Sequence, residues 1–458
     1  MGVSLSDGPA TSDSPRPSLL DPAHRPVSLG TTALISLFAV EYIAVGTAMP
    51  TVARALDGLG LYALAFSATI AASVIGMILG GWWSDKSGPR AVLVVGATVF
   101  AGGLLGAGLS TSMELFVAAR ALQGLGSGMA IVAIYVVIAQ GIPDLLRPRM
   151  FSLLAAAWVV PGLVGPVLTG FLVDQVGWRW VFLGVIPLVV VSMAVLLPAL
   201  GRTEPSEDAP YLGVSTILWA VLAAVSVGVL NLGGEHISVQ DVLIGLPFAV
   251  ALGVAAWRLL PPGTLTLGRG LPSVIAARGA IGASFMAAEA YLPLMLQDLH
   301  GYSPTEAGLA LAVGAVTWAG GSWLQGRLRD TVDRVRVMVV GCTIITVGTG
   351  LLVAAIVTDW PGWTVLVIWG ITQTGVGVAY PTTSLQTMRL SAPQVLGRNS
   401  SSLQVSEALA SAVVLGAVGA VFTALYAASM QSAFAAVAIA SVAAALAAVA
   451  TSARSRPA

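Results

Sequence analysis

Long apolar segments follow one another along almost the whole chain, separated by short polar connections. A helix that crosses a bilayer needs about 20 predominantly apolar residues, and most of these segments reach that length. The pattern predicts fourteen helices, in the order six, two and six, near residues 29–50, 60–83, 90–110, 113–141, 148–173, 180–200, 211–233, 240–259, 272–298, 303–327, 335–357, 362–388, 399–426 and 430–452.

The polar connections divide these helices into groups. Residues 29–200 would form an N-terminal bundle of six helices, and residues 272–452 a C-terminal bundle of six. Residues 201–271 would be a linker that carries two additional central helices. Residues 1–28, rich in Ser, Pro and Asp, are predicted as a disordered cytosolic tail, and residues 453–458 as a second cytosolic tail.

The composition indicates that most of this chain is not surrounded by water. Of its 458 residues, 57% are hydrophobic and only 9% are charged, whereas soluble domains carry about 25% charged residues. The 21 basic and 21 acidic residues cancel, so no general basic surface for nucleic acid is expected. A single cysteine and three histidines exclude a disulfide framework and argue against a metal centre built from these residues. The chain is therefore an all-α integral membrane protein.

The distribution of arginines predicts the orientation in the membrane. If both termini are cytosolic, nearly all Lys and Arg residues, including Arg278, fall in inner segments or at inner helix ends. Only Arg54 and Arg179 fall outside, and Arg120 lies within a span. Because cytosolic loops carry an excess of Lys and Arg, we expect a multi-pass protein of the plasma (inner) membrane with cytosolic ends.

The chain contains an internal repeat. Residues 84–96 resemble residues 329–341, with Asp85 aligned to Asp330, and each stretch follows the second helix of its half. Parallel repeats of six helices place a substrate site near the bilayer midplane between the halves. Chance similarity between two basic loops is the alternative reading.

Four local patterns resemble the major facilitator superfamily. They are Gly81-x-x-x-Asp85-x-x-Gly88-x-Arg90, Arg120-x-x-Gln123-Gly124-x-Gly126, the Gly-Pro run Pro161–Gly170, and Glu41 to Pro50. The last is similar to a motif of the fourteen-helix drug:proton antiporters, with Glu41 in place of its usual Asp. The resemblance covers nearly all of residues 29–452.

This resemblance implies roles for two sets of residues. The loop after the second helix would bias conformational exchange, through Gly81, Asp85, Gly88, Arg90 and the second-half Asp330. The fifth-helix motif would act as a hinge or a close-contact surface, through Gly162, Gly165, Pro166 and Gly170; simple helix packing is the alternative.

Four ionisable residues were placed well inside predicted spans: Glu41, Arg120, Glu289 and Glu407. A charge at a helix centre costs about 2.5–3.5 kcal/mol, so such residues are functional-site candidates. The three acids could exchange a proton for a cation, with Glu41 ranked ahead of Glu289, or they could bond neighbouring helices. Arg120 could set the pKa of a nearby acid or act as a structural donor. Possible cavity contacts, with plain packing as the alternative, are Tyr42, Gln123, Trp158, Tyr291, Trp318, Gln373, Tyr380 and Gln404.

These observations favour a proton-coupled antiporter that exports hydrophobic or cationic drug-like compounds. The alternatives are a proton-coupled transporter of one metabolite or lipid-like product, and a non-transporting membrane receptor or scaffold. The chain carries no G-x-S-x-G, H-E-x-x-H or P-loop pattern, so no enzyme is expected. The expected partners are a small-molecule substrate, protons and the lipid bilayer; we expect a monomer without a cofactor, driven by a proton gradient.

Overall fold

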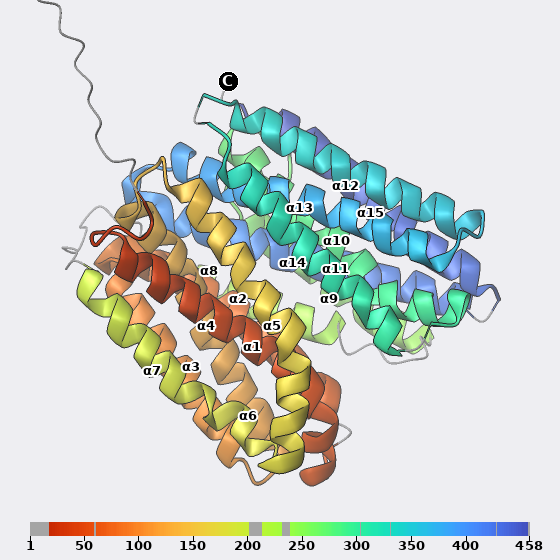
Figure 1. The fold of residues 1–458 in the computed structure, drawn as a ribbon, viewed down its shortest axis with the longest axis horizontal. Helices are drawn as coiled ribbons and strands as arrows, with labels where there is room; N and C mark the ends of the chain where they lie inside the picture. Colours follow the sequence, from red (N-terminus) through yellow and green to blue (C-terminus); the bar gives the residue numbers. More distant parts are fainter. Residues whose placement is uncertain are drawn as a thin grey trace, which may run out of the picture.

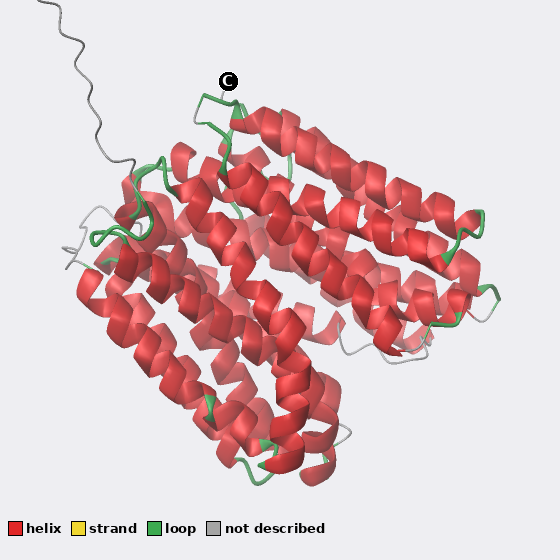
Figure 2. Cartoon of the chain, in the orientation of Figure 1, coloured by secondary structure: helices red, strands yellow, loops and turns green. Residues whose placement is uncertain are grey.

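The computed structural model describes residues 18–58, 61–200, 213–230, 239–302, 304–329, 331–426 and 428–456. In this part of the chain the regular structure is entirely helical, with no strand (Figure 2). The predicted all-helical class is therefore correct. The predicted N-terminal tail up to residue 17 and most of the polar linker lie outside the described residues.

The N-terminal bundle contains six helical segments. They are α1 (Arg25–Ala55), α2 (Tyr62–Ser87), α3 (Pro89–Leu109), α4 (Met113–Gly141), α5 (Arg147–Gln175), and a sixth that is divided into α6 (Arg179–Leu183), α7 (Val185–Leu196) and a 3₁₀ turn, η2 (Leu197–Ala199). The helix α1 begins four residues before the predicted start near residue 29. Pro26 occupies its first turn, where the missing N–H has no helical partner to lose.

The C-terminal bundle repeats this arrangement. Its helices are α10 (Leu271–His300), α11 (Pro304–Gly326), α12 (Arg334–Val357), α13 (Gly362–Leu390), α14 (Leu396–Tyr426), preceded by the 3₁₀ turn η3 (Pro393–Val395), and α15 (Met430–Ala453). Between the bundles, α8 (Val214–Leu230) and α9 (Val239–Leu259) pair with each other and pack on α2 and α14.

The two bundles meet at one end of the molecule. We call the end that holds the start of α1 and the end of α15 the proximal end, and the opposite end the distal end. The bundles converge at the proximal end and diverge towards the distal end (Figure 1). The main contacts between the bundles join α2 to α14 and α5 to α11, and smaller ones join α4 to α14 and α5 to α13; we call this interface the seam.

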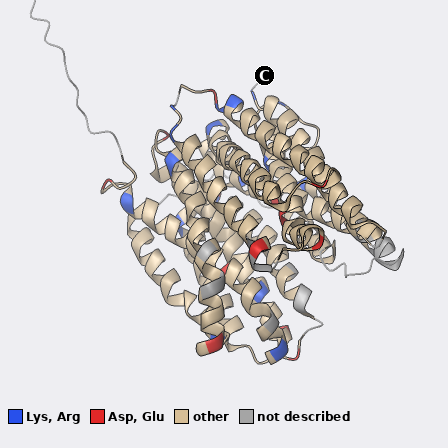
Figure 3. Cartoon of the chain, turned by 45° about the vertical axis from the view of Figure 1, so that its right-hand side comes forward, with Lys and Arg blue, Asp and Glu red and all other residues tan. Residues whose placement is uncertain are grey.

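The exterior of the helices suits an apolar solvent. Ten described helices are long and apolar enough to cross a membrane, and α8 and part of α9 are shorter apolar helices. Charged residues are sparse and lie mainly at helix ends (Figure 3). The multi-pass membrane class is confirmed, whereas the count of fourteen crossings stays a prediction.

The backbones of α2 and α4 approach closely because glycines line their contact. A Cβ at Gly128 would lie 2.2 Å from the carbonyl oxygen of Ser73, and one at Gly76 would lie 2.2 Å from that of Leu125. Real side chains do not reach such distances, so these positions accept only glycine without a backbone shift. Small residues at helix contacts are the usual means of tight packing in membranes.

This packing predicts the effect of one methyl group. Gly128→Ala should destabilise the folded protein by about 1–3 kcal/mol, because overpacking forces the helices apart. Gly350→Ala on α12 is the matched control, since a Cβ there meets nothing within 4 Å and alanine favours the helix. Thermal unfolding in detergent measures both variants. Equal melting temperatures for Gly128→Ala and the parent would contradict the packing argument.

Candidate functional site

An ion pair buried in the N-terminal bundle ties three helices together. Nη1 of Arg120 on α4 donates to carboxylate Oε1 of Glu41 on α1 and to Oε1 of Gln123. Its Nε donates to the carbonyl oxygen of Ala65 on α2 at 3.4 Å. Glu41 is 6% exposed and Arg120 is 3% exposed. Glu41 is therefore a carboxylate whose charge is already balanced inside its own bundle.

The corresponding acid of the C-terminal bundle has a different environment. Glu289 on α10 is half-buried, and its Oε2 accepts a hydrogen bond from Nε2 of Gln373 on α13 at 3.0 Å. Gly370 precedes Gln373 by three residues, as Arg120 precedes Gln123. Within the described ranges, no Lys, Arg or His forms an ion pair with Glu289. Each half thus has an acid on its first helix and a glutamine on its fourth helix, but only in the first half does an arginine pair with the acid.

An aromatic pair lies beside Glu41. Tyr42 follows Glu41 in the sequence, is 59% exposed and makes an edge contact with Trp158 on α5, with ring centroids 6.2 Å apart. Trp158 is also exposed, so the two rings are open to a molecule that approaches this part of the N-terminal bundle.

A second buried ion pair was not anticipated. The sequence places Arg278 at a cytosolic helix end, because it lies near the start of the predicted helix at residues 272–298. The structure places it seven residues into α10, about 10 Å along the axis, with no exposed surface. Its Nε donates to Oε2 of Glu407 on α14 at 2.8 Å. The expectation of only four intramembrane ionisable residues was wrong, because neither composition nor spacing reveals which face of a helix end is covered.

The remaining donors of Arg278 are also satisfied. Nη1 donates to the carbonyl oxygen of Tyr380 at 3.1 Å and to the hydroxyls of Thr383 and Ser384 at 3.0 and 3.2 Å, and Nη2 donates to Oε1 of Gln404 at 3.0 Å. The guanidinium also lies over the ring of Tyr380, whose hydroxyl donates to Glu407 at 2.9 Å. Three residues predicted separately, Tyr380, Gln404 and Glu407, are brought together by an arginine that was not predicted as a partner. Trp318 packs edge-on against Tyr380, with centroids 5.3 Å apart.

One bond of this cluster crosses between the bundles. Nη2 of Arg278 lies 3.4 Å from the hydroxyl of Tyr135, which is on α4 of the N-terminal bundle. The cluster is therefore both the polar centre of the C-terminal bundle and a contact with its neighbour.

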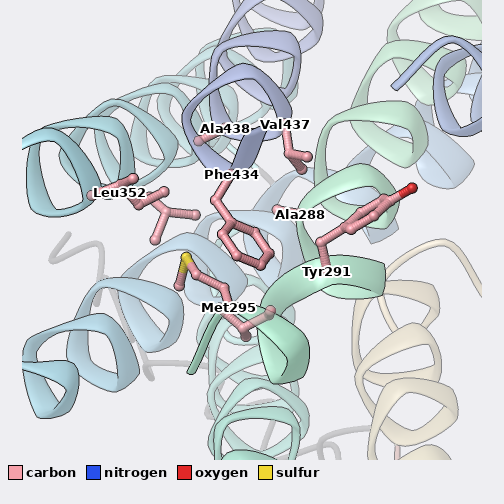
Figure 4. Close-up of a pocket in the computed structure, with 9 residues that line it drawn as sticks. Ala288, Tyr291, Met295, Leu352, Phe434, Val437 and Ala438 are labelled. Carbon is pink, nitrogen blue, oxygen red and sulfur yellow. The ribbon is translucent and has the colours of Figure 1, made fainter. Parts of the chain in front are cut away.

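Tyr291 lies in an apolar environment instead. Its ring packs on Phe422 with centroids 4.5 Å apart and lines a small apolar cavity with Met295, Leu352 and Phe434 (Figure 4). Its hydroxyl points away from the other labelled side chains (Figure 4). Its ring thus packs inside the C-terminal bundle.

The loop after α2 connects the bundles at the proximal end. The carboxylate of Asp85 accepts hydrogen bonds from the backbone N–H groups of Gly397 and Arg398, at 2.6 and 2.7 Å, in the first turn of α14. A carboxylate there satisfies free helix N–H groups and opposes the positive end of the helix dipole. A Cβ at Gly81 would lie 2.5 Å from that of Ser401, so this glycine permits the close approach of α2 and α14.

Two further loop residues stay within the first half. Gly88 has φ 78° and ψ 161°, a conformation that suits glycine, at the reversal between α2 and α3. Arg90 donates to the carbonyl oxygen of Leu200 at 2.8 Å, which ties the start of α3 to the end of the bundle.

The second-half loop is built differently. Asp330 lies outside the described residues. Asp333, which aligns with Gly88, forms an ion pair with Arg456 at 2.7 Å within its own half. Burial alone would raise the pKa of Asp333, but hydrogen bonds from Arg456 and the Val335 backbone hold it below its ordinary value.

The glycines of the fifth-helix motif do not act alike. A Cβ at Gly165 would lie 3.2 Å from Ile43 on α1, whereas Gly162 and Gly170 have nothing within 4 Å. A close contact is therefore present at Gly165 alone among these three. The side chain of Pro166 is outside the described part of the structure.

Residues 31–415 match the Major Facilitator Superfamily. A probable multidrug-efflux transporter of Mycobacterium tuberculosis (strain H37Rv) is 28% identical over 374 residues, 77% of this chain and 78% of the relative. The multidrug efflux pump SdrM of Staphylococcus aureus (strain N315) is 22% identical over 323 residues, 69% of this chain and 72% of the relative.

Solved structures agree with this fold. The human organic anion transporter MFSD10 superposes with a TM-score of 0.70 at 14% identity, over 93% of this chain and 99% of that one. The major facilitator superfamily proton:xylose symporter XylE has a TM-score of 0.66 at 17% identity, over 92% and 94%. The chain belongs to the major facilitator superfamily. It is a membrane transporter of that type and not an enzyme, as the sequence indicated.

The Asp85 contact generates a prediction. Asp85→Asn should reduce transport while leaving membrane insertion intact, because an amide can accept from only one side and presents a donor to the α14 N–H groups. Measurement of transport rate against the amount of inserted protein tests this. The control is Asp144→Asn, a proximal aspartate that pairs with Arg147 inside its own bundle. Normal transport by the well-inserted Asp85→Asn variant would show that this loop does not control the exchange between conformations.

Proposed function

We propose that this transporter is a proton-coupled antiporter that exports hydrophobic or cationic compounds by alternating access. The observation that carries the proposal is Glu289, an intramembrane carboxyl held by a neutral amide and by no cation in the described structure. Such a group can hold a proton in one conformation and release it when a cationic substrate or water reaches it. Exchange of a proton for cargo at one carboxyl is the simplest form of antiport.

The contacts favour Glu289 over Glu41 as the exchanging acid. Protonation of Glu41 would leave the Arg120 guanidinium buried without its counter-ion, and breaking a buried pair in this way costs about 3–5 kcal/mol. Protonation of Glu289 leaves no orphaned charge. We therefore assign Glu289 to proton or cation exchange and the Glu41–Arg120 pair to fixing the positions of α1 and α4, which reverses the order expected from sequence.

The arrangement of the bundles supports alternating access. We propose that the proximal end is cytosolic, in agreement with the arginine distribution, so that a structure closed there and divergent at the distal end is outward-facing. We also propose fourteen crossings, in which α5, α8, α9 and α11 join the ten long apolar helices. The energy would come from the proton gradient.

The names of the relatives support efflux as the direction. Two relatives are named multidrug-efflux proteins, at 28% and 22% identity. The exposed aromatic pair beside Glu41, Tyr42 and Trp158, offers faces that attract organic cations. A chemically broad substrate panel separates this function from transport of a single metabolite, for which only one compound of the panel would be moved.

Orientation can be tested by cysteine labelling in a Cys342→Ala background. Cysteines in place of Ser206 and Ser391 should react with a membrane-impermeant maleimide only from the cytosol, and one in place of Ser238 only from outside. Ser206 and Ser238 precede and follow α8 in the sequence, so labelling of both from one side would remove α8 and α9 as crossings.

The acid assignment can be tested in proteoliposomes with an imposed pH gradient. Glu289→Gln should reduce pH-driven export at least tenfold and remove its dependence on pH, because the amide cannot titrate. Glu41→Gln should instead lower the melting temperature, and adding Arg120→Gln should restore part of it, since the unpaired charge is then gone.

Glu306→Gln on α11 is the control for Glu289→Gln, because it removes an exposed acid of the same bundle. It should transport like the parent. If Glu289→Gln retains pH-driven export and Glu41→Gln abolishes it in stable protein, the assignment of the two acids is reversed.

A further inference from the structure

A groove of about 770 Å³ lies at the proximal end between α5 and α11. One wall comes from each bundle, with Leu153 and Ala156 on α5 and Ala319 and Gly320 on α11. Leu19 and Leu20, from the segment before α1, complete its lining. The groove is therefore apolar and lies on the seam between the halves.

Two arginines stand at the proximal end of this groove, one from each half. Arg149 is in the first turn of α5, and Arg327 directly follows α11; both line the groove and both are exposed. The guanidinium of Arg327 lies 3.8 Å from the ring centroid of Trp323, which also lines the groove. In the described ranges neither arginine forms an ion pair with an acid.

The dimensions suit a molecule with an anionic head and an apolar chain. From Arg149 to Ala156 the groove follows α5 for seven residues, and from Arg327 to Ala319 it follows α11 for eight, about 10–12 Å at 1.5 Å per residue. Guanidinium groups bind phosphate oxygens with paired hydrogen bonds. Basic pockets between membrane helices are typical sites for anionic lipid head groups.

We propose that this groove binds an anionic phospholipid of the proximal leaflet. The phosphate lies between Arg149 and Arg327, and the part of one acyl chain nearest the head group follows the apolar walls towards Ala156 and Ala319. The charge of the two unpaired arginines selects an anionic lipid over a zwitterionic one, and the apolar walls select a lipid over free phosphate.

The position of the groove links lipid binding to conformation. Beside it, the hydroxyl of Ser152 on α5 donates to the carbonyl oxygen of Ser322 on α11, and a Cβ at Gly326 would lie 3.0 Å from the carbonyl oxygen of Pro148. Opening of the proximal end would separate these helices and the two arginines. The lipid therefore binds the proximally closed conformation more tightly and, by linkage, increases its population.

Native mass spectrometry of the full chain tests the binding directly. Titration with dioleoyl-phosphatidylglycerol should give at least threefold more retained lipid than dioleoyl-phosphatidylcholine. The double variant Arg149→Gln, Arg327→Gln should lose this preference. Arg258→Gln should keep it, and it is a matched control because Arg258 also lies over a tryptophan, Trp219 at 5.8 Å, but does not line the groove.

Spin-label distances test the conformational effect. In a Cys342→Ala background, labels at Leu145→Cys and Gln394→Cys report the separation of the proximal ends, since both positions are exposed and belong to different halves. Nanodiscs with phosphatidylglycerol should increase the short-distance population relative to phosphatidylcholine alone, and the double arginine variant should show no increase.

Three results would overturn the proposal. Equal retention of the two lipids would remove the charge selection, and an unchanged preference in the double variant would place the lipid elsewhere. Competition by glycerol phosphate as effective as that by the intact lipid would show a phosphate site without a chain-binding groove. None of these measurements depends on the transported substrate or on Glu289, so they are independent of the proposed function.

Discussion

A charged side chain in an apolar surrounding must find its counter-charge and its hydrogen bonds within the protein, because lipid offers neither. Arg278 meets this constraint completely: it has no exposed surface, and its guanidinium is bonded by groups from α13 and α14 and by Tyr135 of α4. Arg120 meets it with Glu41, Gln123 and the backbone of α2. Each guanidinium fixes the mutual positions of the helices around it.

The two halves share a scaffold but distribute charge differently. In the first half, the charges of Glu41 on α1 and Arg120 on α4 balance each other. In the second half, Glu289 on α10 accepts a hydrogen bond from a glutamine of α13, and the arginine of α10, Arg278, pairs with Glu407 on α14 instead. An acid that is paired with a cation contributes to holding its helices in place, whereas an acid bonded only by an amide leaves its charge without a partner in the described structure. The two halves of the repeat therefore differ in how their acids are balanced.

The helices were predictable, since each apolar segment is long enough to be recognised without tertiary context. Gly81, Gly88 and Asp85 were also recognisable, because their local motif carries the geometry. The Arg278 cluster was not. From the sequence alone, an arginine seven residues into a helix is expected at the membrane interface unless the residues that cover it are known. For Arg278 those residues come from α4, α13 and α14, more than 100 residues away in sequence. The break between α6 and α7 at Gly184 has a local cause: Pro187 has no N–H to donate to the carbonyl of Leu183, four residues earlier, and its ring clashes with that carbonyl.

Between the described residues, few polar bonds cross the seam. They include the two backbone bonds to Asp85, the hydroxyl of Ser152, and the 3.4 Å contact between Arg278 and Tyr135. A neutral hydrogen bond contributes about 1 kcal/mol net and one to a charged group, such as the Asp85 carboxylate, about 1.5–3 kcal/mol; about 1.4 kcal/mol changes a two-state ratio tenfold. If the chain alternates between two conformations, as proposed, the loss or gain of a single bond across the seam would therefore change the ratio of the two conformations severalfold, without any change in the site that binds the cargo.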